Sequence, residues 1–205
     1  MHHFFSMMFS LLAIIGPVSV QSTDGRSERS VDRYYRTELS VSNGGTWGSW
    51  GGKSMCPSGT YANGFSLKVE SPNYFGGDDT ALNGIRLHCV DQPGSYNYNA
   101  IESDVGGWGE WTDVRSCSSG FLTAFQLRVE SRLEDGDDDT AANNINFKCS
   151  EGAVGGEGTN WGDWGDMSPT CEGKGICGLQ TRVEESQGSE GDDTALNDVI
   201  MFCCD

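Results

Sequence analysis

One tetrapeptide, Trp-Gly-x-Trp, occurs three times in the chain, as Trp47-Gly-Ser-Trp50, Trp108-Gly-Glu-Trp111 and Trp161-Gly-Asp-Trp164. A Val-Glu motif follows each copy, in Phe65-Ser-Leu-Lys-Val-Glu70, Phe125-Gln-Leu-Arg-Val-Glu130 and Leu179-Gln-Thr-Arg-Val-Glu184. An Asp-Asp-Thr-Ala-x-Asn motif comes next, as Asp78-Asp-Thr-Ala-Leu-Asn83, Asp138-Asp-Thr-Ala-Ala-Asn143 and Asp192-Asp-Thr-Ala-Leu-Asn197. Each copy then ends on a cysteine, Cys89, Cys149 or Cys203, at spacings of 60 and 54 residues. Motifs that recur in one order at a nearly fixed period identify an internal threefold repeat.

Apolar and polar residues alternate within each copy, as Phe65, Leu67 and Val69 do with the residues between them. This period of two is typical of a half-buried β-strand, and the Gly and Asp/Asn clusters between the strands are typical of turns. Three antiparallel sheets with one apolar face each can bury those faces by facing a common axis. The sequence therefore predicts an all-β prism of three sheets with pseudo-threefold internal symmetry, and Thr37 to Val41 adds one further strand.

The N-terminal residues have a different character. Phe4 to Ile15 is an apolar run too short to span a bilayer, and Gly16 and Pro17 end it. We expect residues 1–22 to be a signal peptide and residues 23–36, with four arginines, to be a mobile extension. The prism domain is then 37–205, with repeats at about 44–90, 105–150 and 158–205. This organisation predicts a secreted, extracellular protein without a membrane partner.

The chain is strongly acidic. It has 205 residues, with 30 Asp and Glu against 13 Lys and Arg and a net charge of -17. From Thr37 to Asp205 the count is 27 acidic and 9 basic residues, a net charge of -18. Binding a nucleic-acid backbone requires an excess of Lys and Arg, so a nucleic-acid partner is excluded. Electrostatics favours cationic partners instead.

All eight cysteines follow the predicted signal peptide, and an even number in an exported chain is typical of a disulfide framework. Repeat equivalence pairs Cys56 with Cys89 and Cys117 with Cys149. The third copy leaves two alternatives. Equivalence selects Cys171 with Cys203 and leaves Cys177 with Cys204, and the crossed pairs are Cys177 with Cys203 and Cys171 with Cys204. No Cys-x-x-Cys pair occurs and the Asp motifs lack an EF-hand spacing, so we expect neither a metal nor a cofactor.

The repeated tryptophans allow two interpretations. Aromatic faces can stack on sugar rings, as in a lectin, but a tryptophan set of this size also buries a large apolar area. The modest apolar content of the domain favours the second interpretation, in which the tryptophans cap the core. His88, the lone histidine after the signal peptide, has the parity of the outer face and is expected to be solvated.

The acidic motifs could supply the paired carboxylates of a glycosidase. Their threefold repetition instead favours a structural turn, because catalysis needs one special environment that separates two pKa values. If a glycan or acidic site exists, its carboxylates should come from Glu70, Glu130 and Glu184, which end the outward-facing row of each sheet. Asn83, Asn143 and Asn197 share the inward parity, so we expect them to be buried and hydrogen-bonded to backbone.

The three ordered motifs, together with the terminal Cys203-Cys204 pair, resemble the vitelline membrane outer layer protein family over about Thr37 to Asp205. The resemblance implies a β-prism of three Greek-key sheets, secretion, and a place in the egg's outer vitelline coat or in mucosal secretions. A weak chito-oligosaccharide transferase activity is attributed to the family without an agreed catalytic residue, so no catalytic residue is assigned here. The chain departs from its own pattern at Ala142, where the other copies have Leu, and at Thr181, which replaces an apolar strand residue.

Two functions follow as hypotheses. The first is a structural or protective component of an extracellular egg coat or mucosal secretion, whose acidic surface engages basic extracellular proteins or glycoproteins. The alternative is a carbohydrate-binding protein or a weak N-acetylglucosamine oligosaccharide transferase. Charge favours the first, because neutral glycans gain nothing from an acidic field, and we expect the protein not to be an enzyme.

Overall fold

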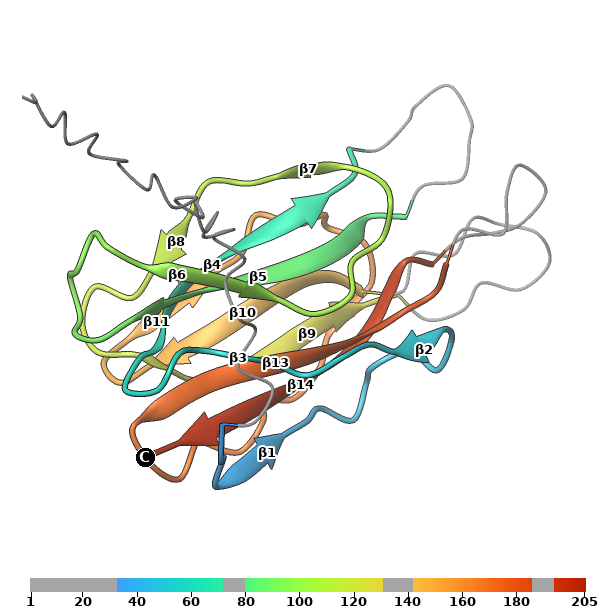
Figure 1. Cartoon of the computed structure of the whole chain (residues 1–205). Helices are drawn as coiled ribbons and strands as arrows, with labels where there is room; N and C mark the ends of the chain where they lie inside the picture. Colours follow the sequence, from blue (N-terminus) through green and yellow to red (C-terminus); the bar gives the residue numbers. More distant parts are fainter. Residues whose placement is uncertain (1–32, 72–79, 131–141, 186–193) are drawn as a thin grey trace, which may run out of the picture.

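The structure is a computed structural model, and it describes residues 33–71, 80–130, 142–185 and 194–205. The described residues form fourteen β-strands in three antiparallel sheets, which surround a common core (Figure 1). No helix among them is long and apolar enough to cross a membrane. The predicted signal peptide and the Asp pairs of the three acidic motifs lie outside the described residues.

Each sheet is built on one long hairpin flanked by short strands. Sheet A has the order β1 (Thr37–Leu39), β14 (Leu196–Cys204), β13 (Gly175–Val183) and β2 (Ser49–Trp50), and β3 (Ser54–Met55) also pairs with β13. Sheet B has the order β6 (Asn99–Glu102), β5 (Leu82–Val90), β4 (Tyr61–Val69) and β7 (Glu110–Trp111), and β8 (Arg115–Ser116) also pairs with β4. Sheet C has the order β11 (Ala153–Gly155), β10 (Ala142–Cys149), β9 (Leu122–Val129) and β12 (Asp163–Trp164).

The repeats interlock, so that no sheet belongs to a single repeat. The short strand that carries each tryptophan motif pairs with the long hairpin of the neighbouring copy: β7 with β4, β12 with β9 and β2 with β13. The first tryptophan motif thus pairs with the hairpin of the third repeat, so the three repeats are linked in a closed cycle. This arrangement is the all-β, pseudo-threefold prism that the repeat predicts.

The core lies along the axis between the sheets. Its members come from the inward positions of all three hairpins and include Phe65, Leu67, Phe125, Phe147 and Leu179, each fully buried. Phe147 contacts both Phe65 and Phe125, with ring centroids 4.7 and 6.3 Å apart. Alternation along the strands therefore reports correctly which side chains face the axis.

Four disulfides fasten the hairpins. Cys56 is bonded to Cys89, Cys117 to Cys149 and Cys171 to Cys203, which are the pairs selected by repeat equivalence, and Cys177 is bonded to Cys204, the pair that they leave. The fourth bond belongs to a second apolar cluster, in which Cys177 and Cys204 pack with Tyr61, Phe121 and Phe202. The crossed pairing in the third repeat is not formed.

The segment before β1 packs on this second cluster. Nη1 of Arg33 donates to the carbonyl oxygens of Thr60 and Pro57 at 2.6 and 3.1 Å, and Arg36 forms an ion pair with Asp205. Arg33 and Arg36, both within the predicted mobile extension, therefore have partners in the domain. The rest of the predicted extension lies outside the described residues.

Candidate functional site

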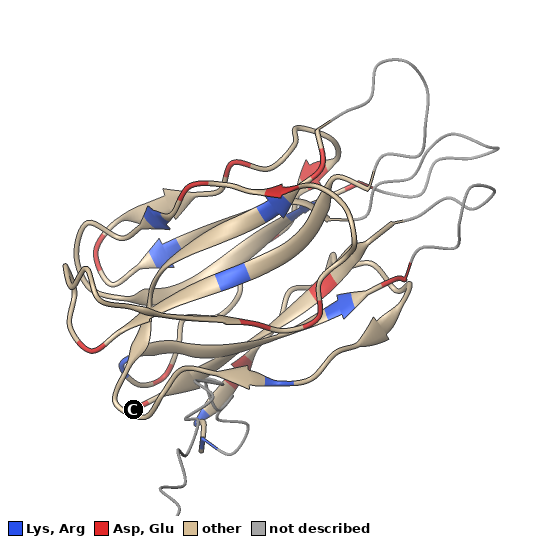
Figure 2. Cartoon of the chain, turned by 45° about the horizontal axis from the view of Figure 1, so that its top comes forward, with Lys and Arg blue, Asp and Glu red and all other residues tan. Residues whose placement is uncertain are grey.

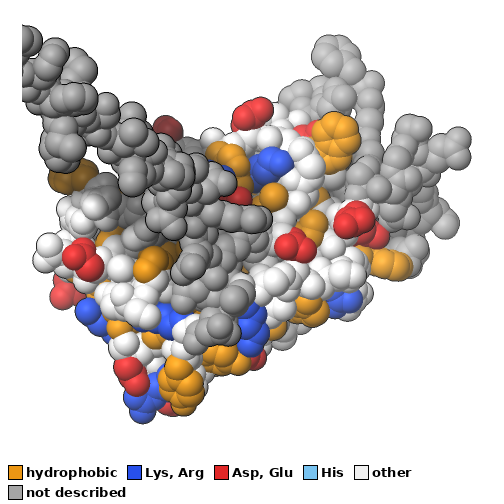
Figure 3. All heavy atoms as spheres, viewed as in Figure 1, with side chains coloured by type: hydrophobic (Ala, Val, Ile, Leu, Met, Phe, Trp, Pro, Cys, Tyr) orange, Lys and Arg blue, Asp and Glu red, His pale blue; other side chains and the backbone are white. Residues whose placement is uncertain are grey.

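The tryptophans of the repeated motif lie at the surface, and the interpretation that they cap the core is wrong. Trp47, Trp108 and Trp161 are 51, 52 and 50% exposed, and Trp50 and Trp164 are also exposed. The buried aromatic volume comes from phenylalanines instead. On the face seen in Figure 3, hydrophobic side chains reach the surface next to acidic ones. The prediction was wrong because burial was inferred from the size of tryptophan, whereas exposure depends on how each motif crosses the neighbouring hairpin.

The glycine of each motif explains this position. Gly48, Gly109 and Gly162 have φ angles of 75, 79 and 68°, in the left-handed region that glycine tolerates best. A Cβ at any of them would lie within 2.3 Å of backbone atoms of the Val-Glu peptide on the neighbouring hairpin. Each tryptophan motif therefore crosses directly over that peptide, and its indoles project to the outside.

Trp111 is half-buried because an arginine covers it. The guanidinium carbon of Arg86 lies 3.8 Å from the centroid of its ring. Glu102 holds this guanidinium with contacts of 3.0 Å to Nε and 2.9 Å to Nη2. Gly84 leaves room for Val105, since a Cβ there would be 2.7 Å from Val105 Cγ1, and the same Cβ would only touch the indole of Trp111 at 3.4 Å. Sheet B thus carries a complete carboxylate, guanidinium and indole stack on its outer face.

The glutamates of the candidate glycan site have structural partners. Oε2 of Glu70 accepts hydrogen bonds from the hydroxyl and the backbone N–H of Thr80, at 2.6 and 3.2 Å. Glu184 accepts one from the Thr194 hydroxyl at 2.5 Å. Glu130 directly follows β9 and is the last described residue before the segment 131–141. For Glu70 and Glu184 these contacts match a turn-closing role.

The asparagines of the third motif continue the same network inward. Asn83, Asn143 and Asn197 are completely buried, as parity predicts. Nδ2 of Asn83 donates to Thr80 Oγ1 at 2.6 Å, and its Oδ1 accepts the backbone N–H of Trp108 at 3.1 Å. Asn197 donates to Thr194 and to the carbonyl of Ala195, and Asn143 accepts from the Thr159 hydroxyl. Each asparagine side chain therefore links its hairpin turn to the structure around it, and at Asn83 the link reaches the backbone of the tryptophan motif.

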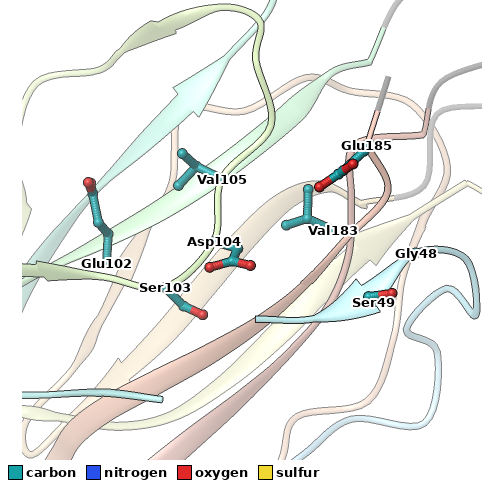
Figure 4. A pocket seen from close by; sticks show the side chains of 8 residues that line it. All are labelled: Gly48, Ser49, Glu102, Ser103, Asp104, Val105, Val183 and Glu185. Carbon is teal, nitrogen blue, oxygen red and sulfur yellow. The ribbon is translucent and has the colours of Figure 1, made fainter. Parts of the chain in front are cut away.

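A groove of about 500 Å³ separates sheets A and B. Its walls are the segment Glu102–Val105 on one side and Val183, Glu185, Gly48 and Ser49 on the other (Figure 4). Thr181, the departure from the apolar pattern, is buried and holds the first wall: its hydroxyl donates to the carbonyl of Asp104 at 2.5 Å, and its N–H donates to Ser103 Oγ at 3.1 Å. Sequence reasoning did not assign this groove, although the Thr181 departure was its signal.

Two titratable groups on the outer faces have shifted pKa values. His88 is 6% exposed, with Nε2 3.0 Å from Ser66 Oγ and the Tyr98 ring 4.5 Å away, so the expectation of a solvated histidine is wrong. Its parity is as expected, but Tyr98 packs edge-on against it. Burial, together with nearby Arg86, lowers the pKa of His88 to about 4. In sheet A, burial raises the pKa of Asp198 to about 6, against the opposing effects of the Val199 N–H and Arg182.

Within the described part of the chain, no group of three His, Cys, Asp or Glu side chains is arranged to hold a metal ion. The carboxylates at hand accept hydrogen bonds, form ion pairs or face solvent. The chemistry that this surface offers is recognition of cations and of hydrogen-bond donors, and its indoles add flat apolar faces.

Comparison with known proteins identifies the family and the fold of the chain. Residues 37–205 match the family model described as vitelline membrane outer layer protein I. The vitelline membrane outer layer protein 1 homologs of mouse and human are 49 and 50% identical, over 85 and 89% of this chain and 86 and 87% of theirs. Among solved structures, Calsepa lectin in complex with bisected glycan and Calystegia sepium agglutinin each superpose with a TM-score of 0.51 at 14% identity. The alignments cover 84 and 83% of this chain and 100 and 97% of those chains, a likeness that shows the β-prism fold alone. The chain belongs to the vitelline membrane outer layer protein I family.

Proposed function

We propose that this chain is a secreted, non-catalytic component of an extracellular egg coat or mucosal secretion, and that its acidic surface binds basic partner proteins. The observation that carries the proposal is the charge of the domain, with 27 acidic against 9 basic residues from Thr37 onward. Such a field attracts and concentrates cationic proteins at low ionic strength. Membership of the family supports the location.

The contacts of the basic side chains strengthen the argument. Lys68, Arg128 and Arg182 donate to backbone carbonyls of the tryptophan loops. Arg36, Lys53, Arg86 and Arg115 form ion pairs with acids of the same chain. These basic groups are therefore engaged within the fold.

The domain has more acidic side chains than its ion pairs can neutralise. Among the described residues, the five ion pairs use Glu38, Glu102, Glu157, Glu172 and Asp205. Figure 2 shows further acidic residues on the connections between strands. The surface therefore presents an excess of carboxylates to a partner.

Affinity capture from the native secretion, with the full chain as bait, tests the proposal. We expect the captured proteins to be basic and to be released by salt. A glycan array run in parallel is expected to show at most weak signals. Capture that persists at 1 M NaCl, or that is limited to neutral glycoproteins and is reproduced on the array, would contradict the proposal.

Carbohydrate binding is the second candidate, and the exposed tryptophans favour it. Indole faces at the surface next to carboxylates are suited to sugar rings and their hydroxyl groups. The likeness to lectins concerns the fold and does not transfer a site. Titration with N-acetylglucosamine oligomers tests this candidate, and binding that is lost when Trp108 and Trp161 are changed to Leu would establish it.

Catalysis is expected to be absent, because Glu70 and Glu184 already hold hydroxyl groups of their own turns. We expect no robust glycosidase or transferase turnover from the purified protein. The assay is incubation with N-acetylglucosamine oligomers followed by mass spectrometry. Product that forms with the wild type and disappears in a Glu70, Glu130 and Glu184 triple alanine variant would make this protein an enzyme.

A further inference from the structure

The three sheets carry the same tryptophan but differ in what lies over it. Trp111 faces Lys68 across the strand pair, Trp164 faces Arg128, and Trp50 faces Arg182. The threefold repeat therefore places an indole beside a cation on the outer face of every sheet. Among the described residues, a second cation lies over this indole in sheet B alone, because Arg86 stacks on Trp111.

Strand register shows why the other two sheets lack this arginine. Arg86 lies opposite Ser66 on the neighbouring strand, and the corresponding pairs are Asn146 opposite Gln126 and Ile200 opposite Gln180. Neither Asn146 nor Ile200 has a guanidinium group that could stack on an indole. No cation lies over Trp50 or Trp164 in the ring contacts of the described residues, and these indoles are 39 and 38% exposed.

The Lys or Arg that lies opposite each tryptophan in the strand pair does not prevent a second guanidinium from stacking on the indole. In sheet B, Lys68 Nζ donates to the carbonyls of Gly106 and Gly107, so its charge is directed into the loop while Arg86 occupies the ring. In sheets A and C the same position behaves alike: Arg182 Nε donates to Gly48 O at 3.1 Å, and Arg128 Nε donates to Gly162 O at 2.9 Å.

Carboxylates lie on or next to the strands that carry the two open indoles. A Cβ on Gly51, the residue after Trp50, would be 2.4 Å from Cγ of Asp104, so that carboxyl group packs against the tryptophan strand. Asp163 precedes Trp164 on β12, so alternation points its side chain to the other face of the strand. Both acids add to the negative field around the indoles, which attracts a guanidinium, and neither is used in an ion pair of the described residues.

We infer that Trp50 and Trp164 bind arginine side chains of the basic partner, each guanidinium stacking on an indole as Arg86 stacks on Trp111. The inference rests on the proposed function and gives it a residue preference. A planar guanidinium stacks on an aromatic face and pairs with a carboxylate at once, which an ammonium does less well. The partner is therefore rich in arginine at its contact surface, and lysine does not substitute equally.

Two peptides on the full-length protein test the inference, nona-arginine and nona-lysine, which have equal charge. At low salt we expect nona-arginine to bind more tightly, and the double variant Trp50→Leu/Trp164→Leu to lose about two- to fivefold in affinity for nona-arginine alone. Equal binding of the two peptides by the wild type, or an unchanged preference in the double variant, would overturn the inference. Failure of both peptides to bind would instead overturn the proposed function.

The indole N–H signals in an NMR titration provide a readout within the wild-type fold, with Trp111 as the internal control. Nona-arginine should shift the signals of Trp50 and Trp164 at least twice as far as that of Trp111, which Arg86 already covers. In Arg86→Asn, which copies the residue of sheet C, Trp111 should begin to respond. A wild-type Trp111 signal that moves as far as the other two, or that stays unresponsive in Arg86→Asn, would contradict the stacking geometry.

Discussion

The inner and the outer faces of the three sheets follow different rules. On the inner faces the buried asparagine recurs in all three copies and most other positions stay apolar, with the buried Thr181 as an exception, and phenylalanines of sheets B and C meet near the axis. On the outer faces one position holds Arg86, Asn146 or Ile200, and another holds Gly84, Asn144 or Asp198. Closure of the prism requires repetition inside, because every sheet contributes to one shared core. Outside, each sheet meets solvent or a partner and is able to diverge.

The largest expected effect comes from the disulfides that fasten each repeat. Changing Cys117 and Cys149 together to Ser opens a loop with a sequence separation of 32 residues. The chain-entropy model gives a loss of roughly 3 to 4 kcal/mol in the free energy of unfolding. Chemical denaturation measures it. The pair Cys177 and Cys204, which no other repeat has, closes a separation of 27 and should cost nearly as much. A loss below about 1 kcal/mol in either variant would contradict this account.

The second-largest expected loss of stability comes from changes to buried polar groups of the inner faces. Asn143→Ala removes a completely buried amide and leaves the Thr159 hydroxyl without its acceptor. We expect a loss of roughly 1 to 3 kcal/mol in unfolding free energy. Asn146→Ala on the same strand is the matched control, since this half-buried residue faces outward and should change stability by less than about 0.5 kcal/mol. Equal effects of the two variants would erase the distinction between the faces.

On the outer face of sheet B, the Arg86 stack should contribute a smaller amount. Arg86→Asn removes one ion pair and one cation–π contact, each of which contributes roughly 0.5 to 1 kcal/mol at a partly exposed site. Thermal unfolding measures the loss, which should shrink as salt is raised. A loss as large as that of Asn143→Ala would mean that this outer position supports the core.

Acid titration separates two outer-face groups whose effects oppose each other. Between pH 6.5 and about 4 the unfolded chain binds a proton at His88 that the folded protein does not, so stability falls as the pH drops. Between about 6 and 3.8 the folded protein binds the extra proton at Asp198, so stability rises as the pH drops. In thermal scans from pH 7 to 4, Asp198→Asn should steepen the decline in Tm and His88→Gln should flatten it. Parallel curves for both variants and the wild type would contradict these pKa shifts.

The sequence predicts the inner faces well and the outer faces poorly. Repetition and alternation identify the three sheets, the buried asparagines and the cysteine equivalence, because burial in a shared core constrains those positions. Alternation alone does not predict how exposed His88 and the tryptophans are. The exposure of His88 depends on its contact with Tyr98, and that of the tryptophans on the close approach of the motif, at Gly48, to the neighbouring hairpin. Thr181 was a signal for the groove at Asp104, but its lining could not be assigned from the sequence, because the walls come from different parts of the chain.

Titration calorimetry with a basic protein tests the central claim most directly, namely that the acidic outer surface is the binding surface. Cytochrome c is a suitable probe, and the same protein with acetylated lysines is the matched control that lacks the charge. We expect binding at 20 mM NaCl that weakens by about tenfold or more at 200 mM, and no binding of the acetylated form. Absence of binding to cytochrome c at 20 mM, or equal affinity for the two forms, would contradict the account.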